Sequence, residues 1–151
     1  MKVNRGFDFT REYRDCGLKL PSRGTANSAG YDLAAAANVC LGPGEMALVP
    51  TGLKAYMQSN EYLGIHIRSS LAIKHGLHLA NSQGIIDSDY YDNPDNEGHI
   101  LIAVVNGGTS KYQIETGMRI AQGIFSRYLL TDQDESHEKE TRTGGIGSTG
   151  T

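Results

Sequence analysis

Two aspartates and a tyrosine stand close together in residues 81–92 (NSQGIIDSDYYD), directly before a loop marked by proline and glycine. Asp87 and Asp89 are two residues apart, and Tyr90 follows them. In an extended strand the two carboxylates share one face and the tyrosine takes the other, although a tight turn would change this. One carboxylate can then act as a general base while the ring packs against a ligand. An acidic surface turn is the competing interpretation.

A second group has the residue types of an anion site. In residues 68–76 (RSSLAIKHG), an arginine and two hydroxyls, Arg68, Ser69 and Ser70, open a segment of helical character. We predict a helix over Ser69–His75, capped by one of the two serines and ended by the following glycine in a left-handed turn. Free N–H groups and the positive end of the helix dipole favour an anion at its start. An ordinary capped helix explains the same residues equally well.

The last ten residues, 142–151 (RTGGIGSTGT), have the composition of a polyphosphate-binding tail. Four of them are glycine, and all the others except Ile146 are arginine or hydroxyl residues. Such a segment cannot bury apolar surface, so alone it is predicted to be disordered. Its glycines let backbone N–H groups turn toward an anion, its hydroxyls add donors, and Arg142 supplies a two-pronged positive charge.

Two further segments are typical of strand ends when each is taken singly. Residues 29–34 (AGYDLA) hold one carboxylate, Asp32, at the entry to a predicted strand. Residues 117–122 (GMRIAQ) follow a turn and end on Gln122. Neither segment is specific by itself.

Short apolar or alternating runs separated by turn residues must position these groups. The clearest predicted strands are residues 46–57, 62–67, 100–105 and 120–130. Glycine accounts for 19 of the 151 residues, roughly twice its usual share, which favours turns and bulges. Closely spaced strands with almost no helix predict an all-β fold, namely a sandwich, a jelly roll or a barrel.

The strand pattern stops near Thr131. We therefore predict one β domain over residues 1–131, followed by a charged linker and the glycine-rich tail over residues 132–151. An extended chain covers ~3.3 Å per residue, so residues 132–141 can span ~30 Å. That reach is enough to deliver the tail onto a neighbouring subunit.

Charge and composition exclude several classes of protein. The formal net charge of −3 argues against a nucleic-acid partner, because proteins that bind nucleic acid present basic surfaces. The N-terminal segment lacks the apolar region of a signal peptide, and no apolar stretch is long enough for a membrane span. Cys16 and Cys40 have no metal-ligand spacing. A disulfide between them is the alternative, but we expect two small buried thiols in a soluble, cytoplasmic protein.

Taken together and in this order, the motifs AGYDL, RSSLA, GIIDSDY, RIAQ and GGIGSTG resemble those of the trimeric dUTP pyrophosphatases (dUTPases) over about residues 29–150. The resemblance implies a homotrimer of jelly-roll, barrel-like subunits that hydrolyses dUTP to dUMP and pyrophosphate with Mg²⁺. It implies active sites at the subunit interfaces, each drawing on three chains, with the flexible tail supplied by one of them. Such an enzyme limits uracil incorporation into DNA and supplies dUMP for thymidylate synthesis.

The resemblance also implies roles for the carboxylates. Asp87 is similar to the catalytic base that orients and deprotonates the water attacking the α-phosphorus, whereas Asp89 matches a less essential position of the motif. Magnesium in the family sits mainly on phosphate oxygens and water, so no direct protein ligand is expected. Asp32 then supports the ion through water or braces Arg68.

The nucleoside and phosphate roles follow in the same way. Tyr90 resembles the tyrosine that stacks on the deoxyribose and leaves no room for a 2′-hydroxyl. The uracil reader corresponds to Asn81 with backbone groups near Ile85 and Ile86, in a snug hairpin that would exclude the methyl group of thymine. The implied phosphate contacts are Arg68, Ser69, Ser70 and Gln122, and the tail residues that close over the nucleotide are Arg142, Ile146, Gly147, Ser148 and Thr149.

Three features depart from the family pattern. Ile146 stands where the tail usually carries an aromatic residue over the uracil, and the spacing from Arg142 to the glycine pair is short. The segment from Tyr91 to His99 (YDNPDNEGH) is longer and more acidic than the usual tight turn. It is either a tolerated surface insertion or a recognition loop for another protein.

That loop motivates a second hypothesis from a different class, a dUTP-gated regulatory module that binds a protein partner. A third hypothesis is a dCTP deaminase on the same fold. The intact IIDSDY segment argues against the deaminase.

Overall fold

The computed structural model describes residues 4–136 and 138–150, and antiparallel strands make up most of its regular structure. Residues 1–3, 137 and 151, which belong to the predicted domain, linker and tail, lie outside the described part. The strands are β1 (Gly6–Phe9), β2 (Tyr31–Ala34), β3 (Val39–Leu41), β4 (Met46–Pro50), β5 (Leu53–Tyr56), β6 (Glu61–Ile67), β7 (Leu77–Leu79), β8 (Gly84–Asp87), β9 (Leu101–Asn106), β10 (Tyr112–Ile114) and β11 (Arg119–Arg127).

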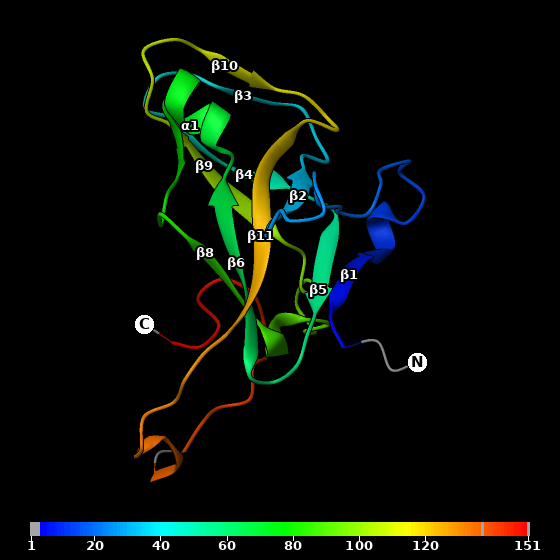
Figure 1. Cartoon of the computed structure of the whole chain (residues 1–151), viewed down its shortest axis with the longest axis vertical. Coiled ribbons are helices and arrows are strands. Elements are labelled where there is room, and N and C mark those ends of the chain that lie inside the picture. The colour runs from blue at the N-terminus through cyan, green and yellow to red at the C-terminus, as the bar shows by residue number, and fades with distance from the viewer. Residues whose placement is uncertain (1–3, 137, 151) are drawn as a thin grey trace.

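One α-helix, α1 (Ser69–His75), and three single 3-10 turns, Arg11–Tyr13, Ser88–Tyr90 and Asp134–Ser136, complete the described elements. The prediction of an all-β fold with one short helix is confirmed (Figure 1).

The strands pair in four antiparallel sheets, with the orders β2-β11-β6-β8, β4-β9-β7, β1-β5 and β10-β3. Side chains alternate between the core and the surface, as in β9, where Ile102 and Val104 are buried between half-buried neighbours. One apolar cluster joins the sheets and includes Leu33, Leu63 and Ile120. This packing of antiparallel sheets around a shared core is the predicted jelly-roll type of arrangement.

The strand predictions are right in place, and two of them differ from the structure by more than one residue at an end or by a break. The strands β6, β9 and β11 lie within or across the predicted runs, but β11 ends at Arg127, three residues early. The run 46–57 forms two strands, β4 and β5, because the chain turns at Gly52 with φ +72°. A side chain there would overlap the ring of Tyr13, so both the backbone conformation and the available space require glycine at this turn.

The helix has the predicted bounds but not the predicted cap. It ends at Gly76, which has φ 69° and whose N–H bonds back to the last turn, as expected for a left-handed C-cap. Neither Ser69 nor Ser70 is the N-cap. Arg68 occupies that position without a side-chain capping bond, because it continues directly from β6 in an extended conformation.

The segment after β11 leads back to the domain. After β11 the chain extends away from the body, bends through Asp134–Ser136, and then returns, so that its red terminal segment lies next to the strands (Figure 1). The tail is therefore held against the domain, as the contacts described below show.

The structure bears on the expected cysteine burial and on the expected absence of a membrane-spanning helix. Cys16 and Cys40 are both exposed and not joined in a disulfide, so the prediction of buried thiols is wrong. Cys40 lies in β3 between a half-buried and a buried residue and points outward by strand alternation. Among the described residues, no helix has the length and apolar character needed to cross a bilayer.

His99 contacts two segments that lie far from it in the sequence, one at Gly52 and one at Tyr13. Its Nε2 accepts the backbone N–H of Gly52 at 2.9 Å, and its ring packs on Tyr13 with centroids 5.3 Å apart. Burial lowers the pKa of His99 below its ordinary value of 6.5. Because the neutral ring accepts the N–H, folding favours the deprotonated form of this histidine.

We therefore expect His99 to add stability that is present above pH 6.5 and is lost as the pH falls through 6.5 toward its lower folded pKa. In His99→Gln the amide oxygen can accept the same N–H without titrating. Urea unfolding between pH 7.5 and 5.5 should show a flatter stability profile for this variant than for the unchanged chain. The difference between the two stability profiles cancels the contribution of the other histidines. Parallel profiles would contradict the proposed contribution of His99.

Candidate active site

A cavity of about 610 Å³ collects most of the residues predicted to bind a nucleoside and the tail. Its walls come from the corner between β7 and β8, from β8 and the turn that follows it, from β4 and β9, and from the tail. Of the predicted site residues, it is lined by Asn81, Ile85, Ile86, Asp87, Tyr90, Arg142, Ile146, Gly147 and Thr149. Sequence reasoning missed its apolar wall, which includes Met46, Leu48 and Leu101.

The sequence pattern at Met46 and Leu48 does not distinguish a cavity wall from the core. They are alternate residues of β4 and are 58% and 47% exposed. Apolar side chains that repeat at period two on a strand are predicted to face the core, so they gave no indication of a ligand wall. Only the position of β4 at the cavity shows that this face is open.

The two aspartates meet through a turn and not along a strand. Asp87 is the last residue of β8, and the 3-10 turn Ser88–Tyr90 begins directly after it. Asp87 and Asp89 thus do not share a strand face, yet both reach the same partner. The guanidinium of Arg142 donates to Asp87 Oδ2 at 2.6 Å and to Asp89 Oδ1 at 2.8 Å.

Arg142 has its side chain only 14% exposed, whereas the aspartates are 52% and 58% exposed. Its guanidinium carbon also lies 5.8 Å from the centroid of the Tyr90 ring, within cation–π range. The tail arginine therefore stands between the candidate base and the candidate sugar-stacking ring. To contact a phosphate, it has to exchange carboxylate oxygens for phosphate oxygens.

Tyr90 is held in place by two hydrogen bonds to its hydroxyl. It is 8% exposed, and its hydroxyl donates to the carbonyl of His99 at 2.8 Å. The same hydroxyl accepts from Nδ2 of Asn96 at 2.8 Å. Asn96 was missed from the sequence, although two asparagines three residues apart in a Pro-containing loop are typical of side-chain bonds to a turn. The tyrosine ring is consequently a rigid wall of the cavity.

The predicted uracil-reading hairpin is a corner between two sheets. Strand β7 pairs with β9 and β8 pairs with β6, so no paired hairpin connects β7 to β8 and that prediction is wrong. The corner is tight, with φ 65° at Ser82 and a 2.7 Å bond from the N–H of Gln83 to the carbonyl of Asn81. Asn81 lies exposed in the cavity wall.

A second cluster lies on the neighbouring strands. Asp32 of β2 accepts from Arg119 at 3.0 Å and lies 3.8 Å from the guanidinium of Arg68. Gln122 is paired in register with Asp32, and Gly30 leaves the space that the Gln122 amide occupies. Ser69 and Ser70 are the first residues of α1. Arg119 was given no role from the sequence, although it begins the motif RIAQ.

The strand register separates the two groups. Asp87 lies opposite Tyr62 near the start of β6, whereas Arg68 follows the end of β6, six residues further on. Six residues of strand span about 20 Å. Arg68, Asp32 and Gln122 do not line the cavity that contains Asp87 and Tyr90. Figure 1 shows α1 and the green turn after β8 at opposite ends of β6.

The residues around Asp32 also bear on metal binding. Within the described part of the chain, no three His, Cys, Asp or Glu side chains are grouped to hold a metal ion. The Asp32 carboxylate faces two guanidinium groups. The charge of this carboxylate is therefore already offset by neighbouring side chains.

Comparison with known proteins gives consistent results. The sequence model of the dUTPase family matches residues 17–150. The deoxyuridine 5'-triphosphate nucleotidohydrolase of Lactococcus lactis subsp. lactis is 52% identical over 150 residues, covering 99% of each chain. The crystal structure of dUTPase from Streptococcus mutans is 48% identical, has a TM-score of 0.79, and covers 84% of this chain and 98% of its own.

A dUTPase from phage phi11 of S. aureus shares the fold at 20% identity, with a TM-score of 0.72 over 86% of this chain and 94% of its own. A mutant of that phage protein is described as coordinating a structural Mg(II) ion.

The anchoring of Tyr90 gives a prediction about stability. Tyr90→Phe removes the hydroxyl and leaves the Asn96 amide and the His99 carbonyl without their partner, so we expect the free energy of unfolding to fall by about 1–3 kcal/mol. Tyr62→Phe, whose hydroxyl makes none of the described hydrogen bonds, is the matched control and should change it by less than about 0.5 kcal/mol. Urea denaturation measures both, and equal effects would contradict the proposed anchoring.

Proposed function

This chain belongs to the dUTPase family, and on that premise we propose how its own residues hydrolyse dUTP to dUMP and pyrophosphate. The reaction class is that of a dUTP nucleotidohydrolase. The observation that carries the proposal is the separation of the nucleoside cavity from the Arg68 cluster by about 20 Å along β6.

Deoxyuridine is proposed to bind in the cavity. Asn81 and the backbone near Ile85 and Ile86 would bond the polar edge of uracil at the tight corner, and contact with this corner would exclude the methyl group of thymine. The ring of Tyr90 would lie against C2′ of the sugar. Because its hydroxyl is held by Asn96 and His99, the ring cannot move aside for a 2′-hydroxyl without breaking both bonds.

Asp87 is proposed as the general base. Its carboxylate is half exposed at the cavity, where it can orient a water molecule and accept its proton. The water oxygen bonds to the α-phosphorus, and the bond from that phosphorus to the α,β-bridging oxygen breaks to release pyrophosphate. Arg142 has to leave Asp87 before this step, and the β- and γ-phosphates offer its guanidinium an equivalent bidentate partner. When Arg142 binds the phosphates, it therefore leaves the Asp87 carboxylate free to accept the proton of the water molecule.

The phosphate chain is proposed to meet Arg68, Ser69, Ser70 and Gln122 of a second subunit, with Arg119 beside them. Asp32 would hold the two arginines in place. Mg²⁺, when bound to the phosphates and to water, would neutralise their charge, and Asp32 is the residue to support it through water. Positioning and electrostatic stabilisation would then supply most of the rate.

We also propose a homotrimer with shared active sites, which the same geometry supports. Two residue groups at opposite ends of β6 cannot contact one triphosphate within one chain, but a symmetric assembly can bring the cavity of one subunit to the Arg68 cluster of the next. The domain would span residues 1–131, with residues 132–151 as its linker and tail. In a cell such an enzyme would keep uracil out of DNA and supply dUMP for thymidylate synthesis from the cytoplasm.

We do not propose the regulatory alternative, because the acidic loop that motivated it is engaged within the chain. Asp92 pairs with Lys54, and Glu97 pairs with Arg11. These charges are therefore committed to holding the loop on the domain.

The role of Asp87 predicts a large and selective loss of rate. Pyrophosphate release from dUTP with Mg²⁺ should fall by ~10³-fold in Asp87→Asn, while Asp89→Asn, the matched control, stays within about tenfold. Binding of a non-hydrolysable dUTP analogue should persist in both, and UTP should be turned over poorly by all three proteins. Equal losses in the two variants would exclude Asp87 as the specific base.

Subunit sharing predicts complementation. Trimers formed at random from equal amounts of Arg68→Ala and Asp87→Asn chains should recover about a quarter of the activity of the unchanged protein, because one site in four joins an intact cavity to an intact Arg68 cluster. Each variant alone should be nearly inactive. If both residues served the same site within one chain, mixing would restore nothing.

A further inference from the structure

The tail is seated on the loop that follows Tyr90. Gly144 and Gly145 are both buried, and the N–H of Gly145 donates to Oδ2 of Asp95 at 3.3 Å. A Cβ built on Gly145 would lie 2.9 Å from Nδ2 of Asn96, and one on Gly144 would lie 3.3 Å from Cβ of Asp95. The glycine pair thus lies so close to the loop that a side chain at either position would crowd it.

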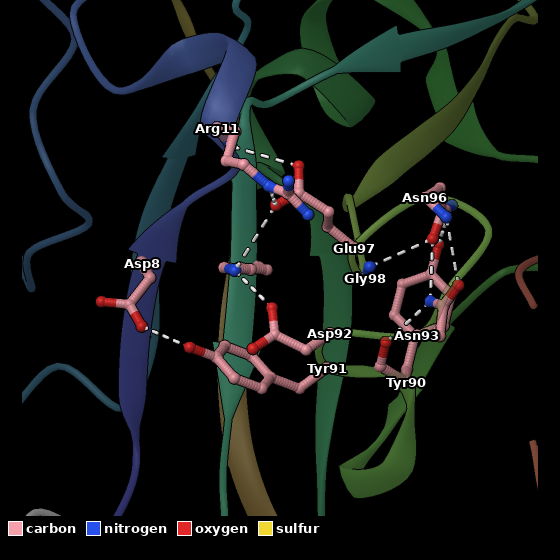
Figure 2. A network of polar contacts seen from close by, with 10 residues as sticks. Asp8, Arg11, Tyr90, Tyr91, Asp92, Asn93, Asn96, Glu97 and Gly98 are labelled. Carbon is pink, nitrogen blue, oxygen red and sulfur yellow. Dashed lines mark hydrogen bonds and ion pairs between the residues drawn. The ribbon is translucent and has the colours of Figure 1, made fainter.

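The seat is rigid because the loop is built around one side chain (Figure 2). Oδ1 of Asn93 accepts the N–H groups of Asp95 and Asn96, both at 3.1 Å. Nδ2 of Asn93 donates to the carbonyl of Tyr90 and to Oδ1 of Asn96, both at 2.8 Å. Asn93 is 5% exposed, so these bonds are shielded from water.

The outer side of the loop is fixed to the N-terminal strands (Figure 2). The Lys54 side chain of β5 is only 7% exposed and pairs with Asp92 and, at 3.9 Å, with Glu97. Glu97 also accepts from Arg11 at 3.0 Å, and Tyr91 donates to Asp8 at 2.7 Å. A buried ammonium that lost these carboxylates would be destabilising, which holds the loop in one shape.

From these contacts we infer that Asp95 and Asn96 are positioning residues, which seat Gly144 and Gly145 and so set where Arg142 and the following tail residues meet the nucleotide. The inference rests on the proposed function and extends it. The same seat serves a tail from its own chain or one delivered by a neighbouring subunit, since the contacting surfaces are the same in both cases.

The seat accounts for the departure at Ile146. This side chain is 78% exposed, so it buries little surface in place of the aromatic stack expected from the family resemblance. In this chain the closed tail is held instead by backbone contact with the loop. The acidic insertion and the missing aromatic residue are then two parts of one arrangement.

Asp95 and Asn96 have separable effects. Asn96 both lies against Gly145 and donates to the hydroxyl of Tyr90, so it connects the tail to the sugar-reading ring. Asp95 contacts the tail and has no described bond to Tyr90. Asp95→Ala should raise KM for dUTP and leave the ratio of kcat/KM between dUTP and UTP unchanged. Asn96→Ala should raise KM and also lower that ratio.

Tail seating can be measured directly, because the chain contains no tryptophan. In full-length protein carrying Ile146→Trp, a non-hydrolysable dUTP analogue with Mg²⁺ should change the indole fluorescence, because residue 146 lines the cavity that the nucleotide would enter. Adding Asp95→Ala should reduce that change and weaken analogue binding by ~10-fold, the size of one hydrogen bond to a charged group. Asp15→Ala, which removes another exposed carboxylate, is the matched control and should overlay the parent titration.

A double-mutant cycle tests whether Asp95 and the glycine act through one contact. Gly145→Ala should weaken analogue binding to a similar extent, and the combined variant should be little worse than either single one. Additive losses, or an Asp95→Ala titration that matches Asp15→Ala, would overturn the seat while leaving hydrolysis intact. Failure of the unchanged protein to release pyrophosphate would instead contradict the proposed function.

Discussion

The backbone pairing of β6 is the constraint on which the rest of the site depends. One edge of this strand bonds to β11 and the other to β8, so its pairing fixes the positions of both residue groups relative to each other. Its length sets a separation of about 20 Å between the Asp87 end and the Arg68 end. That distance is a property of the sheet and cannot be relaxed by side-chain movement. Under the proposed function, this separation leaves one chain with an incomplete site and is a physical reason for assembly.

Electrostatics then links the tail to the chemistry. Arg142 satisfies Asp87 and Asp89 together, with little of its own side chain exposed. A triphosphate presents the same kind of oxygen pair at higher charge, so it can draw the arginine away from the aspartates. Under the proposed mechanism the base is uncovered by the same event that closes the tail. The ring of Tyr90 lies next to Arg142. Its hydroxyl donates to the His99 carbonyl and accepts from Asn96, and these two bonds hold the ring in place.

The structure changes the interpretation of the 91–99 loop. In sequence its acidic residues suggest a surface that is open to a partner. In the structure Lys54, held in a largely buried position, draws Asp92 and Glu97 onto the domain, and Asn93 closes the turn behind them. Asp95 and Asn96 of the same loop contact Gly144 and Gly145. This insertion thus lies between the N-terminal strands, the ring of Tyr90 and the tail.

Local signals determined much of this protein. The motifs identified the family, the alternation of apolar residues located β6, β9 and β11, and the glycine after α1 ended that helix where it was expected. The sequence did not reveal the break at Gly52, the outward-facing Cys40, the corner between β7 and β8, or the roles of Asn96 and Asp95. Each of these depends on a neighbour brought in by folding, such as the ring of Tyr13 at Gly52 or a glycine 50 residues away at Asp95. Side-chain periodicity and turn chemistry act over a few residues and can be read in order, whereas such contacts exist only once the sheets have packed.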